Sequence, residues 1–147
     1  MPRIHTGQFG ELDYEEESTF LFPRGLPGFE HCRRFVLLNQ PSLEPLVHMQ
    51  SLDIPDLCFL ALPVQTIDCT YETELTPEDQ QTLGGPAVTL DLALLSVAAV
   101  GQLTANLLAP VVINLADRIG VQAVRSDLKY SHQQPVYFEE GVEEAAC

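Results

Sequence analysis

The stretch Thr104–Val124, TANLLAPVVINLADRIGVQAV, limits the possible folds more than any other part of the chain. Its first half is a nearly continuous apolar run containing Pro110, which lacks a backbone donor and would break a helix but is tolerated at the start or edge of a strand. A polar corner follows at Ala116–Arg118, and the chain then returns with the alternating pattern of a half-buried strand. We therefore predict a β-hairpin whose strands are Pro110–Asn114 and Ile119–Val124.

Short strand signals recur along the rest of the chain, separated by corners rich in proline and glycine. The expected strands are Ile4–Phe9, Leu12–Tyr14, Ser18–Phe22, Arg34–Asn39, Leu46–Leu52, Leu57–Leu62 and Val88–Leu94, while Pro135–Phe138 is either a last edge strand or part of an attached tail. This pattern predicts an all-β fold, a small barrel-like or sandwich domain with one or two short helices. Its expected core includes Phe59, Leu90, Leu92, Ala109, Val111 and Ile113.

The clearest helix signal covers Pro77–Leu83. Thr76 is a good N-cap residue, proline fits the first helical position, and Asp79 stands where an acidic residue supports the first turn. Gly84 and Gly85 then supply the backbone freedom with which helices commonly end. We expect a helix of about two turns at this position.

The charge of the chain is strongly negative and unevenly distributed. Its 147 residues are enough for one domain, and the formal net charge is -14. No Lys or Arg occurs between Phe35 and Asp117, so most of the surface would repel RNA and attract a basic protein. The alternative is that the acidity serves only solubility.

We expect the folded domain to cover residues 1–138 and the acidic segment 139–147 to be a disordered tail. The N-terminus lacks the apolar core of a secretory signal, and no apolar run reaches the ~18 residues of a membrane helix. These features predict a cytoplasmic protein that has no membrane partner.

Residues with catalytic or metal-binding chemistry are scattered. A zinc site built from His48, Cys58 and Cys69 would match no familiar ligand spacing. Two enzymatic alternatives are a Cys58 nucleophile and an acid pair of Asp53 and Asp56, but no neighbour in the sequence lowers the thiol pKa, and acids are common in turns. The sequence therefore favours a protein that is not an enzyme and that uses neither a cofactor nor a metal.

A second distinctive stretch is Phe22–Glu30, FPRGLPGFE, in which proline and glycine alternate with large apolar residues. Proline restricts φ and glycine permits positive φ, so we expect a rigid loop in which Leu26 and Phe29 are covered by the core. Such a loop serves either as a structural corner or as a binding surface.

Several segments resemble the FliW family of flagellar assembly factors in their order and spacing. They are Phe22–Glu30, Gln50–Phe59, Tyr71 with Glu72 and Glu74, and Thr104–Asn114 followed by Gly120–Gln122. The resemblance extends over Ile4–Tyr130, and its most specific part is the NLLAP-x-V-I-N pattern that begins at Asn106. Members of this family are small all-β proteins of barrel-like form, so the resemblance implies that fold here.

The resemblance also implies partners. FliW family members bind CsrA, a basic RNA-binding translational repressor, and relieve its repression of flagellin synthesis; they also bind flagellin itself. We therefore expect CsrA and flagellin as partners, without direct binding of nucleic acid. The alternative is a generic acidic chaperone or scaffold that has no CsrA activity.

We expect the partner to contact a surface that includes Leu26, Phe29, Tyr71, Glu72 and Asn106. Rigid loops lose little entropy on docking, and an aromatic residue flanked by acids suits a basic partner. The alternative is that Phe29 and Tyr71 are buried packing residues.

Overall fold

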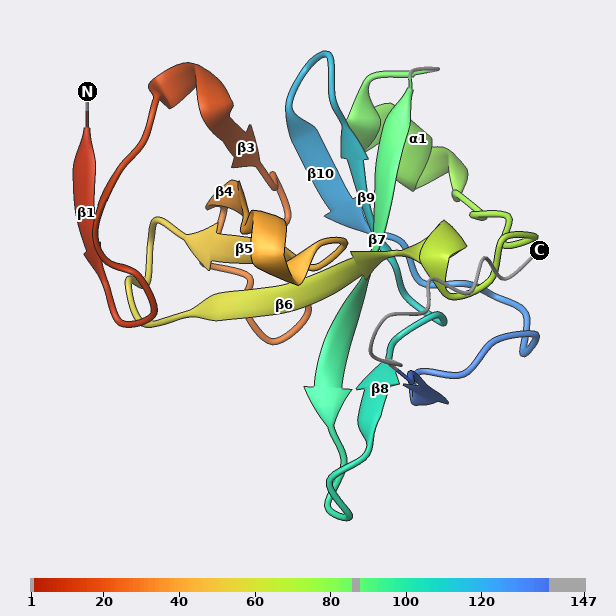
Figure 1. Ribbon diagram of the computed structural model, residues 1–147. Helices are drawn as coiled ribbons and strands as arrows, with labels where there is room; N and C mark the ends of the chain where they lie inside the picture. The colour runs from red at the N-terminus through yellow and green to blue at the C-terminus, as the bar shows by residue number, and fades with distance from the viewer. Residues whose placement is uncertain (1, 86–87, 138–147) are drawn as a thin grey trace.

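Seven strands close into a β-barrel in the computed structural model, which describes residues 2–85 and 88–137 (Figure 1). In pairing order they are β7 (Thr89–Val97), β6 (Cys58–Pro63), β5 (Val47–Ser51), β4 (Arg34–Asn39), β3 (Thr19–Leu21), β10 (Ile119–Gln122) and β9 (Val111–Asn114). The ring closes because β9 pairs with both β10 and β7. Neighbouring strands are antiparallel except β3 and β10, whose parallel pairing is limited to Leu21 and Ile119. The expected all-β, barrel-like fold is confirmed.

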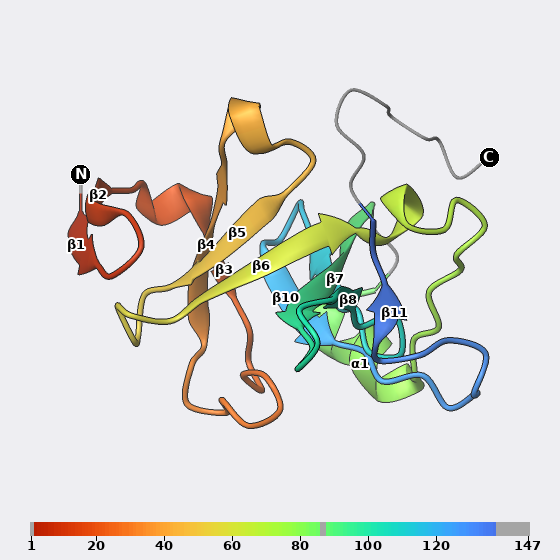
Figure 2. The ribbon, with the colours of Figure 1, turned by 60° about the horizontal axis from the view of Figure 1, so that its bottom comes forward.

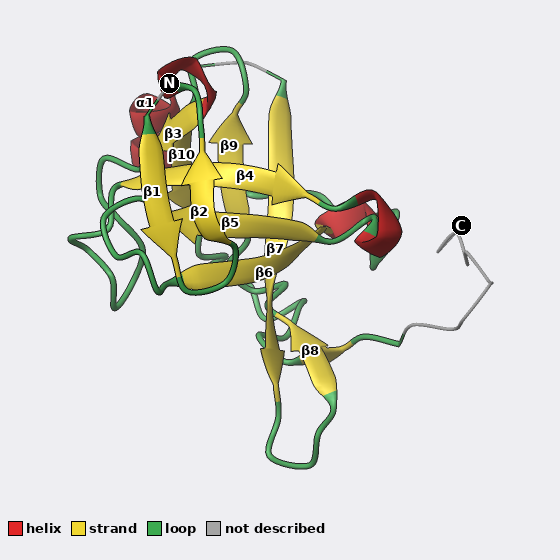
Figure 3. Cartoon of the chain, turned by 60° about the vertical axis from the view of Figure 1, so that its left-hand side comes forward, coloured by secondary structure: helices red, strands yellow, loops and turns green. Residues whose placement is uncertain are grey.

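The long strand β7 belongs both to the barrel and to a smaller extension. Its first residues, Thr89–Leu92, pair with β9, and Leu92–Leu94 pair with β6 on the other edge. Leu95–Val97 pair instead with β8 (Leu103–Ala105), and β11 (Gln134–Pro135) covers the far edge of β8. The β7–β8 hairpin therefore extends away from the barrel body (Figure 3).

The N-terminal strands β1 (Arg3–Thr6) and β2 (Gly10–Asp13) form a separate hairpin. It lies on the side of the barrel opposite β11 (Figure 2). The ring of Phe9 packs edge-on against His48, with centroids 5.3 Å apart, and joins the hairpin to β5. The first strand is shorter than the expected Ile4–Phe9 because the chain turns before Gly10, whose φ is +63°.

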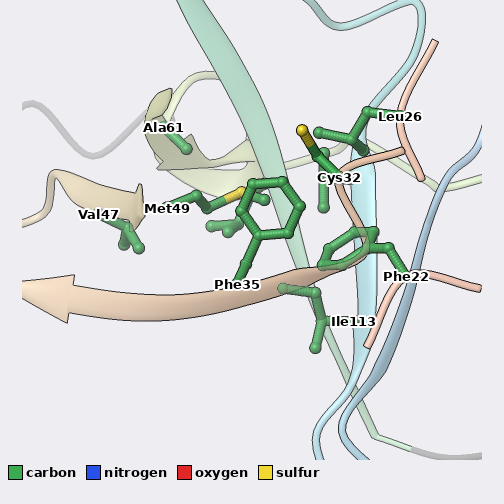
Figure 4. Close-up of a cluster of buried hydrophobic side chains, with 10 residues drawn as sticks. Phe22, Leu26, Cys32, Phe35, Val47, Met49, Ala61 and Ile113 are labelled. Carbon is green, nitrogen blue, oxygen red and sulfur yellow. The ribbon is translucent and has the colours of Figure 1, made fainter. Parts of the chain in front are cut away.

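The interior of the barrel is filled by one cluster of buried apolar side chains (Figure 4). The cluster consists of Phe22, Leu26, Cys32, Phe35, Val47, Met49, Ala61, Leu92, Val111 and Ile113. Four of the expected core residues are buried, and these are Leu92, Ala109, Val111 and Ile113. Phe59 and Leu90 are half-buried and pack against the cluster. The core prediction is therefore confirmed for the four buried residues, whereas Phe59 and Leu90 lie at the edge of the core.

The predicted helix forms as α1 (Pro77–Leu83). Oγ1 of Thr76 accepts a hydrogen bond from the backbone N–H of Asp79 at 3.0 Å, and Gly84 ends the helix with a φ of 89°. The helix covers β9 and β10 through a small apolar cluster, which consists of Leu83, Val112, Val121 and Ala123. Single turns of 3-10 helix occur at η1 (Glu16–Ser18), η2 (Pro41–Leu43) and η3 (Val64–Thr66).

The hairpin predicted from the most constraining stretch is confirmed as β9 and β10, with slightly shorter strands. The expected edge strand at Pro135–Phe138 corresponds to β11 only at its first residue. The proposed boundary at residue 138 and the acidic tail 139–147 fall outside the described residues. Within the described part of the chain, no helix has the length and apolar character needed to cross a membrane.

Candidate protein-binding surface

The NLLAP segment, Asn106–Pro110, is an insertion between β8 and β9, which pair along the same edge of β7. The backbone N–H of Asn106 donates to the carbonyl of Leu94 at 2.9 Å. Oδ1 of Asn106 accepts hydrogen bonds from the backbone N–H groups of Leu108, at 3.1 Å, and Ala109, at 3.0 Å. The side chain expected to contact a partner therefore also fixes the shape of the insertion.

Tyr71 lies beneath this insertion and is only 4% exposed. Its hydroxyl donates a hydrogen bond to the carbonyl of Leu107 at 2.6 Å, and the N–H of Leu107 donates to the carbonyl of Ser131 at 3.0 Å. Burial raises the pKa of the Tyr71 hydroxyl, which keeps it a neutral donor. Tyr71 is therefore a buried packing residue, as the alternative expectation states.

Arg125 organises the surroundings of Tyr71, although its side chain is only 3% exposed. Its guanidinium packs against a pair of contacting aromatic rings, 5.1 Å from the centroid of Tyr71 and 4.9 Å from that of Tyr130, and the two centroids are 4.5 Å apart. Nε and Nη2 each donate to one carboxylate oxygen of Asp127 at 2.9 Å, and Nη1 donates to the backbone carbonyl of Glu72. One buried cation thus joins the loop before α1 to the segment after β10.

Four acidic residues lie beside Arg125 and Tyr130, and we call them the acidic surface: Asp68, Glu72, Glu74 and Asp127. The carboxylates of Glu74 and Asp127 contact Arg125, Asp68 interacts with Tyr130, and Glu72 is joined to Arg125 through its backbone carbonyl. Glu72 is exposed, and the side chain of Glu74 is 52% exposed with Oε1 at 3.7 Å from Nη2 of Arg125. The hydrogen bonds from Arg125 lower the pKa of Asp127, and the Thr70 hydroxyl lowers that of Asp68. The carboxyl groups of Asp68 and Asp127 therefore carry negative charge at neutral pH, and Lys129, above the ring of Tyr130, offsets part of it.

The Phe22–Glu30 loop lies elsewhere, because Leu26 belongs to the barrel core and Tyr71 to a separate cluster. Leu26 is 2% exposed, and its carbonyl accepts a hydrogen bond from the N–H of Phe29 at 2.7 Å. Phe29 is half-buried and packs edge-on against Phe59. Gly25 has a φ of +63°, and a Cβ there would lie 2.5 Å from the Glu30 carbonyl oxygen. The loop is thus a rigid structural corner, and the five expected contact residues do not form one cluster.

Sequence reasoning identified Tyr71, Glu72 and Asn106 but missed Arg125. The only local signal for Arg125 is the Arg-x-Asp spacing to Asp127. Its other hydrogen-bonding partner, the carbonyl of Glu72, is 53 positions away in the chain. A pattern search within short windows therefore could not connect these residues.

Cys58 and Asp53, residues of the two enzymatic alternatives, lie in surroundings that serve the fold. Burial raises the pKa of the Cys58 thiol, which opposes its use as a nucleophile. Oδ2 of Asp53 accepts hydrogen bonds from the backbone N–H groups of Arg33, at 2.8 Å, and Arg34, at 2.9 Å, and so holds the start of β4. Over residues 2–85 and 88–137, no group of His, Cys, Asp and Glu side chains is arranged to hold a metal ion.

Comparisons with known proteins agree on one family. The family model for FliW protein matches residues 3–136. A flagellar assembly factor FliW from Clostridium tetani is 31% identical over 142 residues, which cover 94% of this chain and 97% of that protein. One from Azoarcus sp. is 36% identical over 132 residues, which cover 83% and 90% of the two chains.

The comparison with solved structures identifies the same family. A crystal structure of the flagellar assembly factor FliW aligns with this chain at a TM-score of 0.83 and 31% sequence identity. The alignment covers 96% of this chain and 100% of that one, so it includes the barrel and the extension built on β7. Family model, relatives and fold together establish that this chain belongs to the FliW family of flagellar assembly factors.

Proposed function

We propose that this protein binds CsrA and relieves its repression of flagellin mRNA, and that it also binds flagellin. The proposal rests on membership of the FliW family of flagellar assembly factors. The structural observation that supports it most is the acidic surface, which Arg125 organises through the carboxylates of Glu74 and Asp127 and the backbone of Glu72. A basic RNA-binding protein is the type of partner that such a surface attracts.

The acidic surface is also held in place before any partner arrives. Arg125 fixes the backbone at Glu72 and the carboxylate of Asp127, so little conformational freedom remains to be lost on docking. Once the complex has formed, the net charge of -14 also repels RNA that approaches the basic partner. Binding beside the RNA-binding face of CsrA would therefore lower its RNA affinity, either by this repulsion or by coupling between sites.

The residues expected at the partner surface have different roles in this proposal. Glu72 is exposed and makes direct contact. Asn106 is half-buried and contributes the exposed part of its side chain, whereas Phe29 packs against the barrel core and has no contact role on the acidic surface. Tyr71 is buried and holds the backbone of the NLLAP segment through the Leu107 carbonyl, and Leu26 is part of the barrel core.

The test is a titration of CsrA against wild-type protein and Glu72→Lys at low and high salt. We expect wild-type affinity to weaken with salt, and Glu72→Lys to weaken binding about tenfold at low salt, mainly through slower association. Glu15→Lys is the matched control, because it makes the same charge change on an exposed acid next to η1, far along the chain from the acidic surface.

Equal losses in the two variants would contradict the placement on the acidic surface. A wild-type protein that leaves CsrA free at micromolar concentration would contradict the function itself and favour the generic acidic chaperone or scaffold. A parallel titration with flagellin tests the second partner, and a gel shift with RNA alone should show no complex.

A further inference from the structure

A second surface with different chemistry lies beside η2, where β4 ends and β5 begins (Figure 3). It is a groove of about 390 Å³. Its apolar lining consists of Leu37, Pro45, Leu46, Val47, Pro63 and Leu90. The groove is distinct from the acidic surface, because none of its lining residues belongs to the loop before α1 or to the segment after β10.

The groove is a place where the barrel core reaches the surface. Val47 belongs to the main buried cluster, and Leu37 and Leu90 pack against that cluster while remaining half-buried. Leu43, in the turn that forms the rim, is 42% exposed. When a partner covers apolar surface that continues from the core into an open groove, the burial of that surface stabilises the complex.

The size of the groove indicates what could fill it. An apolar cavity of about 150 Å³ holds one benzene molecule, so 390 Å³ accommodates more than one aliphatic side chain. Residues three or four positions apart on a helix present such side chains next to one another. An amphipathic helix therefore matches the volume and the apolar lining together.

The charge beside the groove determines which charged residues such a helix should carry next to its apolar stripe. Glu44 is exposed and is the charged residue of the lining. Among the residues that the structure describes, it forms no ion pair, and the chain has no Lys or Arg between Phe35 and Asp117. A basic residue beside the apolar stripe of a partner would therefore meet Glu44 without competition from a neighbouring cation.

We infer that this groove binds an amphipathic helix of a partner protein, with Leu-sized side chains in the groove and Lys or Arg beside Glu44. The inference goes beyond the proposed CsrA binding and does not depend on it. It gives the protein two docking surfaces, one selected by charge and the other by apolar contact next to a single acid.

The test uses two labelled helical peptides with the same leucine stripe, one with Lys and one with Glu on the remaining positions. Binding to the full chain is followed by fluorescence anisotropy at physiological salt. We expect the Leu/Lys peptide to bind at least tenfold more tightly than the Leu/Glu peptide. Glu44→Lys should weaken the Leu/Lys complex about tenfold, and Leu46→Ser, which removes an apolar lining residue, should weaken both complexes.

Two matched controls separate the groove from general attraction to an acidic protein. Glu15→Lys makes the same change in net charge, and Val100→Ser removes an apolar side chain that is 89% exposed at the tip of the β7–β8 hairpin. Both should leave peptide binding unchanged. Equal weakening by Glu15→Lys and Glu44→Lys, or no effect of Leu46→Ser in a protein with a normal melting curve, would overturn the inference. CsrA titrations of the groove variants report on the other surface, so the two proposals fail separately.

Discussion

The barrel core and the cluster around Arg125 are held together by different forces. Phe22, Phe35 and Ile113 have no exposed surface, and their neighbours in the core are apolar. The other cluster places a guanidinium against a pair of tyrosine rings and satisfies it with directed hydrogen bonds. Apolar packing depends on buried area and shape, whereas a buried cation depends on each partner being present. The core should therefore respond to lost volume, and the Arg125 cluster to lost charge and to pH.

The largest effect should come from the core. Ile113→Ala removes apolar volume at a fully buried position, and we expect it to lower the free energy of unfolding by about 2–5 kcal/mol. Chemical denaturation measures this loss. Val97→Ala, at a position that is 70% exposed, should change stability by less than about 0.5 kcal/mol. Equal curves for wild type and Ile113→Ala would show that this position does not support the core.

A smaller effect is expected where the buried cation is lost. Arg125→Met keeps much of the apolar length but removes the hydrogen bonds to Glu72 and Asp127, so we expect a loss of about 1.5–3 kcal/mol. Arg33→Met is the control, because its exposed side chain should contribute little. If both variants unfold at the same denaturant concentration, the comparison between the two regions fails.

Removing a single hydroxyl should cost less still. Tyr71→Phe leaves the ring in place but loses the hydrogen bond to the Leu107 carbonyl, and the expected loss is about 1 kcal/mol. Tyr137→Phe makes the same chemical change at a residue that is 76% exposed and should have no measurable effect. Thermal unfolding of the two variants side by side would separate the buried hydroxyl from the exposed one.

The smallest expected effect is a pH dependence. Hydrogen bonds from Arg125 lower the pKa of Asp127 in the folded state, so this group contributes stability above its unfolded pKa and loses it as pH falls through the folded pKa. Asp127→Asn should therefore lower the melting temperature at neutral pH, and the difference from wild type should vanish at acidic pH. In the Arg125→Met background the difference should already be small at neutral pH. A difference that persists in that background would assign the effect to another partner.

Local signals made part of this structure predictable. The N-cap at Thr76 and the glycines after Leu83 define α1 because each acts within a few residues. The β9–β10 hairpin was predictable for the same reason, since period-2 alternation and a short corner are both local. The core residues of these strands followed from the alternation.

The site was less predictable because its contacts are not local. Tyr71 and Glu72 were identified in the sequence, but whether Tyr71 lies inside or outside depends on Leu107 and Arg125, far along the chain. The Phe22–Glu30 loop shows the same limit, because its rigidity could be predicted while its position in the barrel core depended on the complete ring. No pattern in a short window indicates which strand edges will meet.

The parallel contact between β3 and β10 has a consequence for how the chain is made. Leu21 meets Ile119, so the ring has no closing strand until most of the polypeptide has left the ribosome. At about 5–20 residues per second, translation separates these two strands by roughly 5–20 s. The antiparallel meander of β3, β4, β5 and β6 pairs only consecutive strands and is available early. During synthesis, the inner face of this meander therefore stays uncovered until β9 and β10 have been translated, and the translation rate sets how long that takes.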